Sequence, residues 1–295
     1  MRSVGHGYLR SAAFLLVFFF THVSSALVLS KSKVPYYGDA FYEAVSRGER
    51  DQALLEIIRE TLTSVHVKRA SQADQLARSC PTGSSCYSHV AVGYEPARRK
   101  LFGELHLVQV GREYGVLDVY CEKTFLPGDF KSSEAKPGPD TIPEGNVVNA
   151  EHTWPQSRFN RATDPATQKC DLHHLFPTDN RMNSTRGNLK FGEVDNPREV
   201  LKCPISKIGQ INSAQGEFFE PPDKHKGNAA RALLYFSIRY KIHIEPIEEK
   251  FLKKWNREDP VDAHEAHRND RIQQIQGNRN PFVDHPELAD AISDF

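Results

Sequence analysis

The sequence predicts a mixed α+β fold, a single domain in which helices flank a small set of strands. Three observations favour this class. Apolar residues recur at helical spacing near both ends of the chain, whereas short apolar or alternating runs fall in its middle third. The sequence also contains no internal repeat and no low-complexity segment.

Residues 1–26 are expected to form a cleaved secretory signal. Arg2 and Arg10 precede the apolar run AAFLLVFFF, and small residues follow, ending at Ala26. An N-terminal membrane anchor is the alternative, although the run is short for a bilayer span. We therefore expect a domain over residues 27–295 that is secreted to an extracellular or periplasmic space, with no membrane contact in its mature form.

The net charge and the cysteines limit the possible partners of the protein and the environment in which it folds. Without Arg2 and Arg10, the chain has 36 Lys and Arg against 38 Asp and Glu, a net charge of −2. Global charge thus gives no support to a polyanionic partner, and any attraction must come from a local patch. Of the five cysteines, Cys80 and Cys86 flank a short loop that a disulfide bond can close. The odd number leaves at least one free thiol or a bond between chains.

The first elements read as helices and then strands. Residues 39–65 have helical spacing and predict two short helices broken near Gly48. Residues 99–121 predict two strands around a turn at Gly111. Prolines and glycines in residues 131–146 predict a surface loop, with a domain boundary as the less favoured reading.

The next segments predict a strand, a loop, a second strand and a helix. The strands are expected over residues 147–152 and 171–177, and Thr178 and Asp179 offer N-caps for a helix that Gly187 ends.

The last third is predicted to be mostly helical. One helix falls within residues 218–243. Another is expected over residues 259–277, with Asp259 as its cap, Pro260 at its first position and Gly277 at its end.

Two neighbouring segments hold the residue types needed for phosphodiester hydrolysis. Glu151 and His152 are adjacent, and Asp171, His173 and Asn188 fall in the strand-to-helix passage that follows. Such hydrolysis needs an activated water and a cation that neutralises developing charge. A neutral histidine can act as the base, and carboxylate and amide oxygens suit Mg²⁺. Capping residues and buried structural histidines are an equally favoured reading of the composition alone.

Four motifs resemble the endonuclease I family of secreted and periplasmic bacterial nucleases, which have a ββα-metal (His-Me finger) core. The resemblance extends over roughly residues 95–288. Its motifs are NAEHTWPQSRF, DLHHLFPTDNRMNSTRGNLKFG, FEPPDKHKGNAARALLYFSIRY and IQQIQGNRNPFVDHPE.

The resemblance implies a role for individual residues. His152 is expected to be the general base, and Glu151 and Asn188 are expected to hold the divalent ion, Mg²⁺ with Mn²⁺ or Ca²⁺ as substitutes. Family members also use an arginine at the phosphate, in several cases within a cysteine-bearing insertion that this chain lacks. The candidates for that role are Arg186, which is favoured, Arg158 and Arg161, and the supporting residues are expected to be His173 and Asn183. A bend after His152, at Trp154 and Pro155, is expected to let the adjacent Glu151 and His152 serve one site.

Other polar residues have structural readings. Arg231 lies in an apolar helical stretch and is expected either to line a cleft or to form an ion pair. His264 and His267 have a spacing that zinc sites use, but exposure on a charged helix is the favoured reading. The glycosylation sequon at Asn183 lies inside the predicted site helix, so no glycan is expected there.

The resulting hypothesis is a secreted, sequence-nonspecific, metal-dependent endonuclease acting on DNA and RNA, with no protein partner implied. Local charge favours it modestly, because residues 151–192 hold six Lys and Arg against four Asp and Glu. Activity is expected to rise with pH through the ordinary histidine range. The alternatives are a non-catalytic nucleic-acid-binding protein that keeps the fold, and a metallo-hydrolase of another ester.

Overall fold

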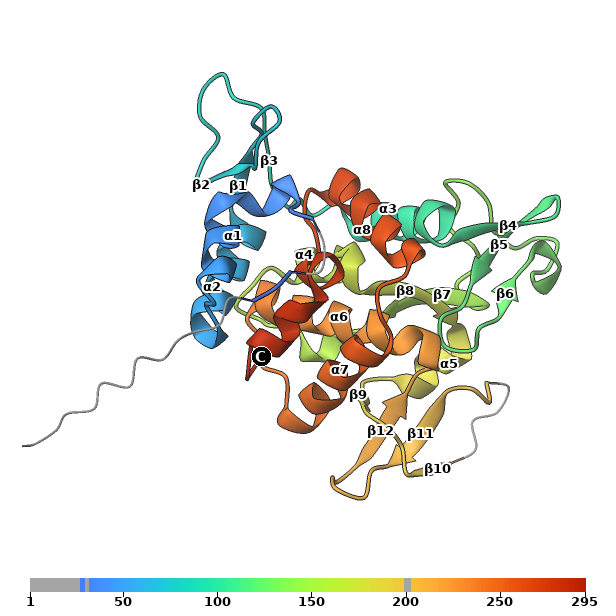
Figure 1. The fold of residues 1–295 in the computed structure, drawn as a ribbon. Coiled ribbons are helices and arrows are strands. Elements are labelled where there is room, and N and C mark those ends of the chain that lie inside the picture. Colours follow the sequence, from blue (N-terminus) through green and yellow to red (C-terminus); the bar gives the residue numbers. More distant parts are fainter. Residues whose placement is uncertain (1–26, 30–31, 199–202) are drawn as a thin grey trace, which may run out of the picture.

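The computed structural model describes residues 27–29, 32–198 and 203–295, so the expected signal over residues 1–26 lies outside the described residues. Helices and short strands follow one another along the chain (Figure 1), which confirms the α+β class. None of the helices that the structure describes is both long and apolar enough to cross a lipid bilayer.

The N-terminal part contains the two predicted helices. They are separated near Gly48, whose φ is +75°, as expected. A small antiparallel sheet with the order β2-β1-β3 follows, and the Cys80–Cys86 disulfide closes the loop before β3, as predicted. The bounds are η1 (Pro35–Tyr37), α1 (Gly38–Ser46), α2 (Asp51–Thr63), β1 (Val65–Val67), β2 (Gln75–Ala77) and β3 (Cys86–Tyr87).

The segment predicted as two strands begins with helix instead. The strands themselves lie around the turn at Gly111, and a third strand extends them into the sheet β4-β5-β6. Residues 130–147 contain neither helix nor strand, which confirms the predicted loop. The bounds are α3 (Tyr94–Lys100), η2 (Leu101–Leu105), β4 (Leu107–Val110), β5 (Glu113–Leu117), β6 (Thr124–Phe125) and η3 (Pro127–Asp129).

A two-stranded hairpin followed by a short helix forms the centre of the molecule. Strands β7 and β8 pair antiparallel, and α5 begins directly after β8. The carboxylate of Asp179 accepts hydrogen bonds from the backbone of Arg181 and Met182, and Gly187 ends the helix with φ +56°, so both predicted boundaries are confirmed. The bounds are β7 (Val148–His152), η4 (Gln156–Arg158), α4 (Pro165–Cys170), η5 (Leu172–His174), β8 (Leu175–Asp179) and α5 (Asn180–Arg186).

A four-stranded sheet, which the sequence did not predict, follows α5. Its order is β10-β11-β12-β9, with β9 parallel to β12. The Cys121–Cys203 disulfide joins this region to the loop between β5 and β6, and Cys170 is a buried free thiol. The bounds are β9 (Lys190–Phe191), β10 (Asn196–Arg198), β11 (Lys207–Gln210) and β12 (Glu217–Glu220).

The C-terminal third is helical, as predicted, but one boundary was wrong. Helix α8 begins at Ala263 with Asp262 as its cap, whereas Asp259 ends α7, a helix that the sequence pattern missed. Gly277 does end α8, with φ +83°. The bounds are α6 (Asp223–Tyr240), α7 (Pro246–Glu258), α8 (Ala263–Gln276), α9 (Pro281–Asp284) and η6 (Pro286–Ala291).

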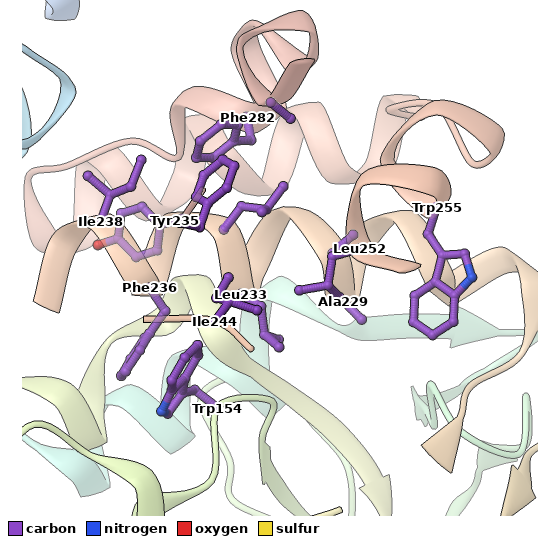
Figure 2. Close-up of a cluster of buried hydrophobic side chains, with 14 of the residues drawn as sticks. Trp154, Ala229, Leu233, Tyr235, Phe236, Ile238, Ile244, Leu252, Trp255 and Phe282 are labelled. Atoms are coloured by element: carbon purple, nitrogen blue, oxygen red, sulfur yellow. The ribbon is translucent and has the colours of Figure 1, made fainter. Parts of the chain in front are cut away.

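The main core surrounds α6. Figure 2 shows apolar side chains of α6 against those of the C-terminal helices, with Trp154 reaching the same cluster from the end of β7. The rings of Trp154 and Phe236 stack with centroids 5.5 Å apart. A second cluster contains Phe130 and Val148, which lie on either side of the loop over residues 131–146. The loop therefore does not separate two cores.

Candidate active site

The β7–β8 hairpin presents Glu151 and His152 on a regular ladder. Glu151 pairs with Phe176 and His152 with Leu175, and the amide of Thr153 still bonds the carbonyl of His174 at 3.0 Å. The pair itself therefore lies in regular strand, and the chain bends directly after it at Thr153 and Trp154, where the sequence predicted a bend. Adjacent side chains of a strand point to opposite faces, and the side chains of Glu151 and His152 accordingly have separate hydrogen-bond partners.

The carboxylate of Glu151 is held inside the protein by two donors. Its Oε1 accepts a hydrogen bond from the Tyr120 hydroxyl at 2.8 Å and from Nη1 of Arg186 at 2.9 Å. Oε2 has no hydrogen-bond partner among the described residues. Burial raises the pKa of Glu151, opposed by the charge of Arg186 and the hydrogen bond of Tyr120.

Arg186 is placed differently from an exposed phosphate contact. Its side chain is 1% exposed, its Nη1 also bonds the carbonyl of His152 at 3.1 Å, and its Nη2 bonds that of Thr153 at 2.8 Å. The guanidinium lies 4.6 Å from the ring centroid of Phe191. These contacts make Arg186 a clamp between α5 and the end of β7.

The imidazole of His152 is held neutral, in one defined tautomer. Its Nε2 lies 3.1 Å from the carbonyl oxygen of Lys169. Because a carbonyl only accepts, Nε2 must donate its hydrogen, which leaves Nδ1 as the basic nitrogen. The amide nitrogen of Gln156 lies 3.4 Å from Nδ1. Burial, together with the charge that His174 would add, lowers the pKa of His152 to about 3.

The two asparagines of the α5 region have different surroundings. The amide of Asn183 donates to Oδ1 of Asn149 at 2.6 Å and to the carbonyl of Ala150 at 3.3 Å, which ties α5 to β7. Asn188, the second expected metal ligand, follows Gly187 and is exposed. Its amide has no hydrogen-bond partner within the part of the chain that the structure describes.

The DLHH motif is mainly structural. Asp171 is buried and accepts hydrogen bonds from the hydroxyls of Tyr235 at 2.7 Å and Tyr240 at 2.8 Å, which fasten α6 to the motif. His173, an expected supporting residue, is buried with Nε2 3.2 Å from the carbonyl of Asn278. It packs behind the hairpin and, among the described residues, makes no hydrogen bond or ring contact with Glu151 or His152.

The remaining arginine candidates also differ in position. Arg158 forms an ion pair of 2.8 Å with the buried carboxylate of Glu248 and lies 4.7 Å from the ring centroid of Trp154. Arg161 is exposed and lines a hollow of about 380 Å³ beside His152. Arg161 is therefore the one of the three whose guanidinium is open to a ligand.

The structure separates the other polar residues from the site. Arg231 forms a buried ion pair of 2.6 Å with Glu265, which confirms the ion-pair reading. His264 lies 3.2 Å from the carbonyl of Leu105. Within the part of the chain that the structure describes, no group of three or more His, Cys, Asp or Glu side chains could hold a metal.

Sequence reasoning missed Tyr120, Gln156 and Lys169. Tyr120 was visible only as the neighbour of Cys121, and it lies 31 positions from Glu151. Gln156 is four residues after His152 and Lys169 is 17 residues after it. No spacing rule connects such positions before the fold is known.

Comparison with known proteins identifies a matching protein family. The Endonuclease I family model matches residues 83–287. An extracellular ribonuclease of Bacillus amyloliquefaciens is 39% identical over 164 residues, covering 49% of this chain and 53% of the relative. An extracellular deoxyribonuclease of Aeromonas hydrophila is 32% identical over 115 residues, covering 39% and 48%. A periplasmic deoxyribonuclease of the same organism is 31% identical, covering 39% and 47%. The chain thus spans about half the length of the curated relatives it matches.

Proposed function

Since the chain belongs to the endonuclease I family, we propose that it is an exported, metal-dependent endonuclease that hydrolyses phosphodiester bonds of DNA and RNA without sequence preference. The observation that supports this best is the state of His152. It is neutral, its Nε2 is fixed by the carbonyl of Lys169, and its Nδ1 has, among the described residues, only the long hydrogen-bond contact with Gln156.

His152 acts as the general base. Nδ1 takes a proton from the water that attacks phosphorus, and the carbonyl of Lys169 stabilises the imidazolium because it already accepts from Nε2. The contact of 3.4 Å from Gln156 to Nδ1 is long for an N–H···N bond, so a water can replace it at little cost. Gln156 then remains close enough to orient that water.

Glu151 and Asn188 hold the divalent ion, Mg²⁺ with Mn²⁺ or Ca²⁺ as substitutes. The donor set fits a hard cation, because Oε2 of Glu151 is unbonded and the amide of Asn188 is exposed. Mg²⁺ keeps several waters and needs few protein ligands. When bound, it would neutralise the charge that develops on the phosphate. Tyr120 and Arg186 orient the carboxylate by fixing Oε1.

Contacts to phosphates explain the breadth of substrate. Phosphate oxygens convey no sequence information, so a site that grips them accepts many sequences. Arg161 is the arginine best placed for a phosphate, since Arg158 is paired with Glu248 and Arg186 with Glu151. The relatives named above include both ribonuclease and deoxyribonuclease, which favours activity on both nucleic acids.

We expect this nuclease to act outside the cytoplasm. The leader-like residues 1–26, the disulfides Cys80–Cys86 and Cys121–Cys203, and the extracellular or periplasmic relatives support it.

The test is digestion of linear DNA, circular DNA and RNA, with and without EDTA and over a range of salt. Nicking of the circle, cleavage of both nucleic acids, and loss of activity in EDTA or at high salt are expected. Binding of DNA without any cleavage in Mg²⁺ would instead identify a non-catalytic binding protein. Cleavage that persists in excess EDTA would exclude the role of the ion.

A further inference from the structure

We propose that the hollow beside His152 is a subsite for the nucleotide next to the scissile bond, with its phosphate bound by Arg161 and Lys169. The inference rests on the proposed function and adds the substrate feature that this part of the site recognises: a second phosphate.

The hollow lies directly beside His152. It lies between η4 and α4 and measures about 380 Å³, within the range of small-ligand sites. Three of its lining residues also contact His152: Gln156 through its amide, Lys169 through its carbonyl, and Phe159 with ring centroids 6.2 Å apart. A nucleic-acid strand whose scissile phosphate lies at Nδ1 of His152 therefore places the neighbouring nucleotide in this hollow.

The charge of the hollow fits an anion. Arg161 and Lys169 are its charged lining residues, and no carboxylate lines it. Neither cation has an ion-pair partner within 4.0 Å among the described residues, in contrast to Arg158 and Lys190, which are paired with glutamates. Asp164, close in sequence, is occupied in capping the first turn of α4. An unpaired guanidinium and an unpaired ammonium on one hollow are suited to phosphate.

The other lining residues can contact a sugar or a nucleobase without distinguishing one nucleobase from another. Phe159, Pro165 and Ala166 offer apolar contact, and Phe159 is held in place against His174 and Phe236. The ammonium of Lys169 lies 4.5 Å from the ring centroid of Tyr94, which keeps the long side chain at the rim. Recognition by charge and apolar contact predicts strong dependence on phosphate and weak dependence on base.

The experiment compares thymidine dinucleotides that have the linking phosphate alone with those that have one further phosphate at the 5′ or the 3′ end. For the wild-type protein, a further phosphate at one of the two ends should raise kcat/KM by roughly tenfold or more, as expected for a charge-assisted contact. Arg161→Ala and Lys169→Ala should each reduce this gain, and the double variant should abolish it. Retention of the full gain by the double variant would overturn the proposal.

The matched control is Arg112→Ala, which removes an exposed cation from the turn between β4 and β5 that does not line the hollow. It should keep the full gain. An equal loss of the gain in Arg112→Ala and in the double variant would show a general effect of charge and would overturn the subsite. Melting curves should be the same for all variants, since Arg161 is exposed and Lys169 partly so.

A second measurement is independent of cleavage. Binding of a fluorescent single strand in EDTA should weaken with salt, and each lost phosphate contact should reduce the slope of log K against log salt by about 0.7. If the wild-type protein cleaves nothing, the proposed function fails, but a smaller slope in the double variant still supports the subsite. An unchanged slope contradicts the subsite even if cleavage is normal.

Discussion

The guanidinium of Arg186 and the carboxylate of Glu151 form an ion pair of 2.9 Å in which both side chains are about 1% exposed. The pair joins the end of α5 to β7. Arg186 bonds Oε1 alone, so the pair neutralises the buried carboxylate and leaves Oε2 for the divalent ion that we propose. The same arginine bonds the carbonyl of His152, and it therefore fixes the strand that presents the proposed base.

Loss of this arginine should destabilise the protein strongly. Arg186→Met leaves the Glu151 carboxylate buried without its partner, and the free energy of unfolding should fall by about 3–5 kcal/mol. Adding Glu151→Gln should restore part of it. The control is Arg257→Met, whose exposed pair with Asp290 contributes roughly 0–1 kcal/mol. Urea denaturation measures the wild-type protein and the three variants, and an equal cost for Arg186→Met and Arg257→Met would contradict the role.

Metal titration should separate the base from the ligands. His152→Ala should lose about 10²- to 10⁴-fold in rate, with no recovery at high Mg²⁺ or Mn²⁺, because a cation cannot replace a proton acceptor. Asn188→Ala should recover partly, since it weakens the ion only. Glu151→Gln should behave likewise and is preferred to Glu151→Ala because it keeps an acceptor for Arg186. Equal rescue of all three variants would sink this assignment of roles.

Tyr120 should act as a positioning residue for Glu151. Tyr120→Phe removes one hydrogen bond to Oε1, worth about 1 kcal/mol, so Mn²⁺ binding should weaken roughly fivefold. Binding of an oligonucleotide in EDTA should not change. Calorimetry measures the first and fluorescence anisotropy the second, with the exposed Tyr114→Phe as control. Unaltered Mn²⁺ affinity in Tyr120→Phe speaks against the role.

The pH dependence should not follow an ordinary histidine. The pKa of His152 is lowered to about 3, so its neutral form is already dominant above that pH and no rise in activity is expected around pH 6.5. This prediction differs from the expectation from the sequence, in which activity rises through the ordinary histidine range. The pKa of Glu151 is raised, so protons compete with the cation as the pH falls. Once Mg²⁺ exceeds its dissociation constant, each tenfold rise in its concentration should move the acid limb down by about one pH unit.

The measurement is kcat/KM against pH at several Mg²⁺ concentrations. If the midpoint of the acid limb of this profile stays at the ordinary histidine pKa at every Mg²⁺ concentration, the buried, neutral environment of His152 is contradicted.

The covalent state of the exported protein is also predictable. Peptide mapping should find an N-terminus near Leu27 and disulfides Cys80–Cys86 and Cys121–Cys203. Cys170 is 1% exposed, so its thiol should react with an alkylating reagent only after unfolding. Retention of residues 1–26 would contradict cleavage of the signal. Rapid alkylation of Cys170 in the native protein would contradict the burial of its thiol.

The sequence by itself determined the elements that depend on neighbours along the chain. The two helices around Gly48, the strand that ends at His152 and the helix between Asp179 and Gly187 were all predicted, because capping, strand alternation and positive φ are properties of a few consecutive residues. The prediction failed where local signals were ambiguous. Asp259 resembled an N-cap because Pro260 follows it, yet it ends α7, and the cap of α8 is Asp262.

Only the tertiary structure decided what each polar residue of the candidate site contacts. Glu151 and His152 were adjacent in the sequence, but the regular ladder sends them to different partners: Tyr120 and Arg186 for one, Lys169 and Gln156 for the other. Arg186, favoured as the phosphate contact, is buried and bonds Glu151 and the carbonyls of His152 and Thr153. The physical reason is that burial and pairing set the charge and availability of a side chain, and both depend on residues that only folding brings together.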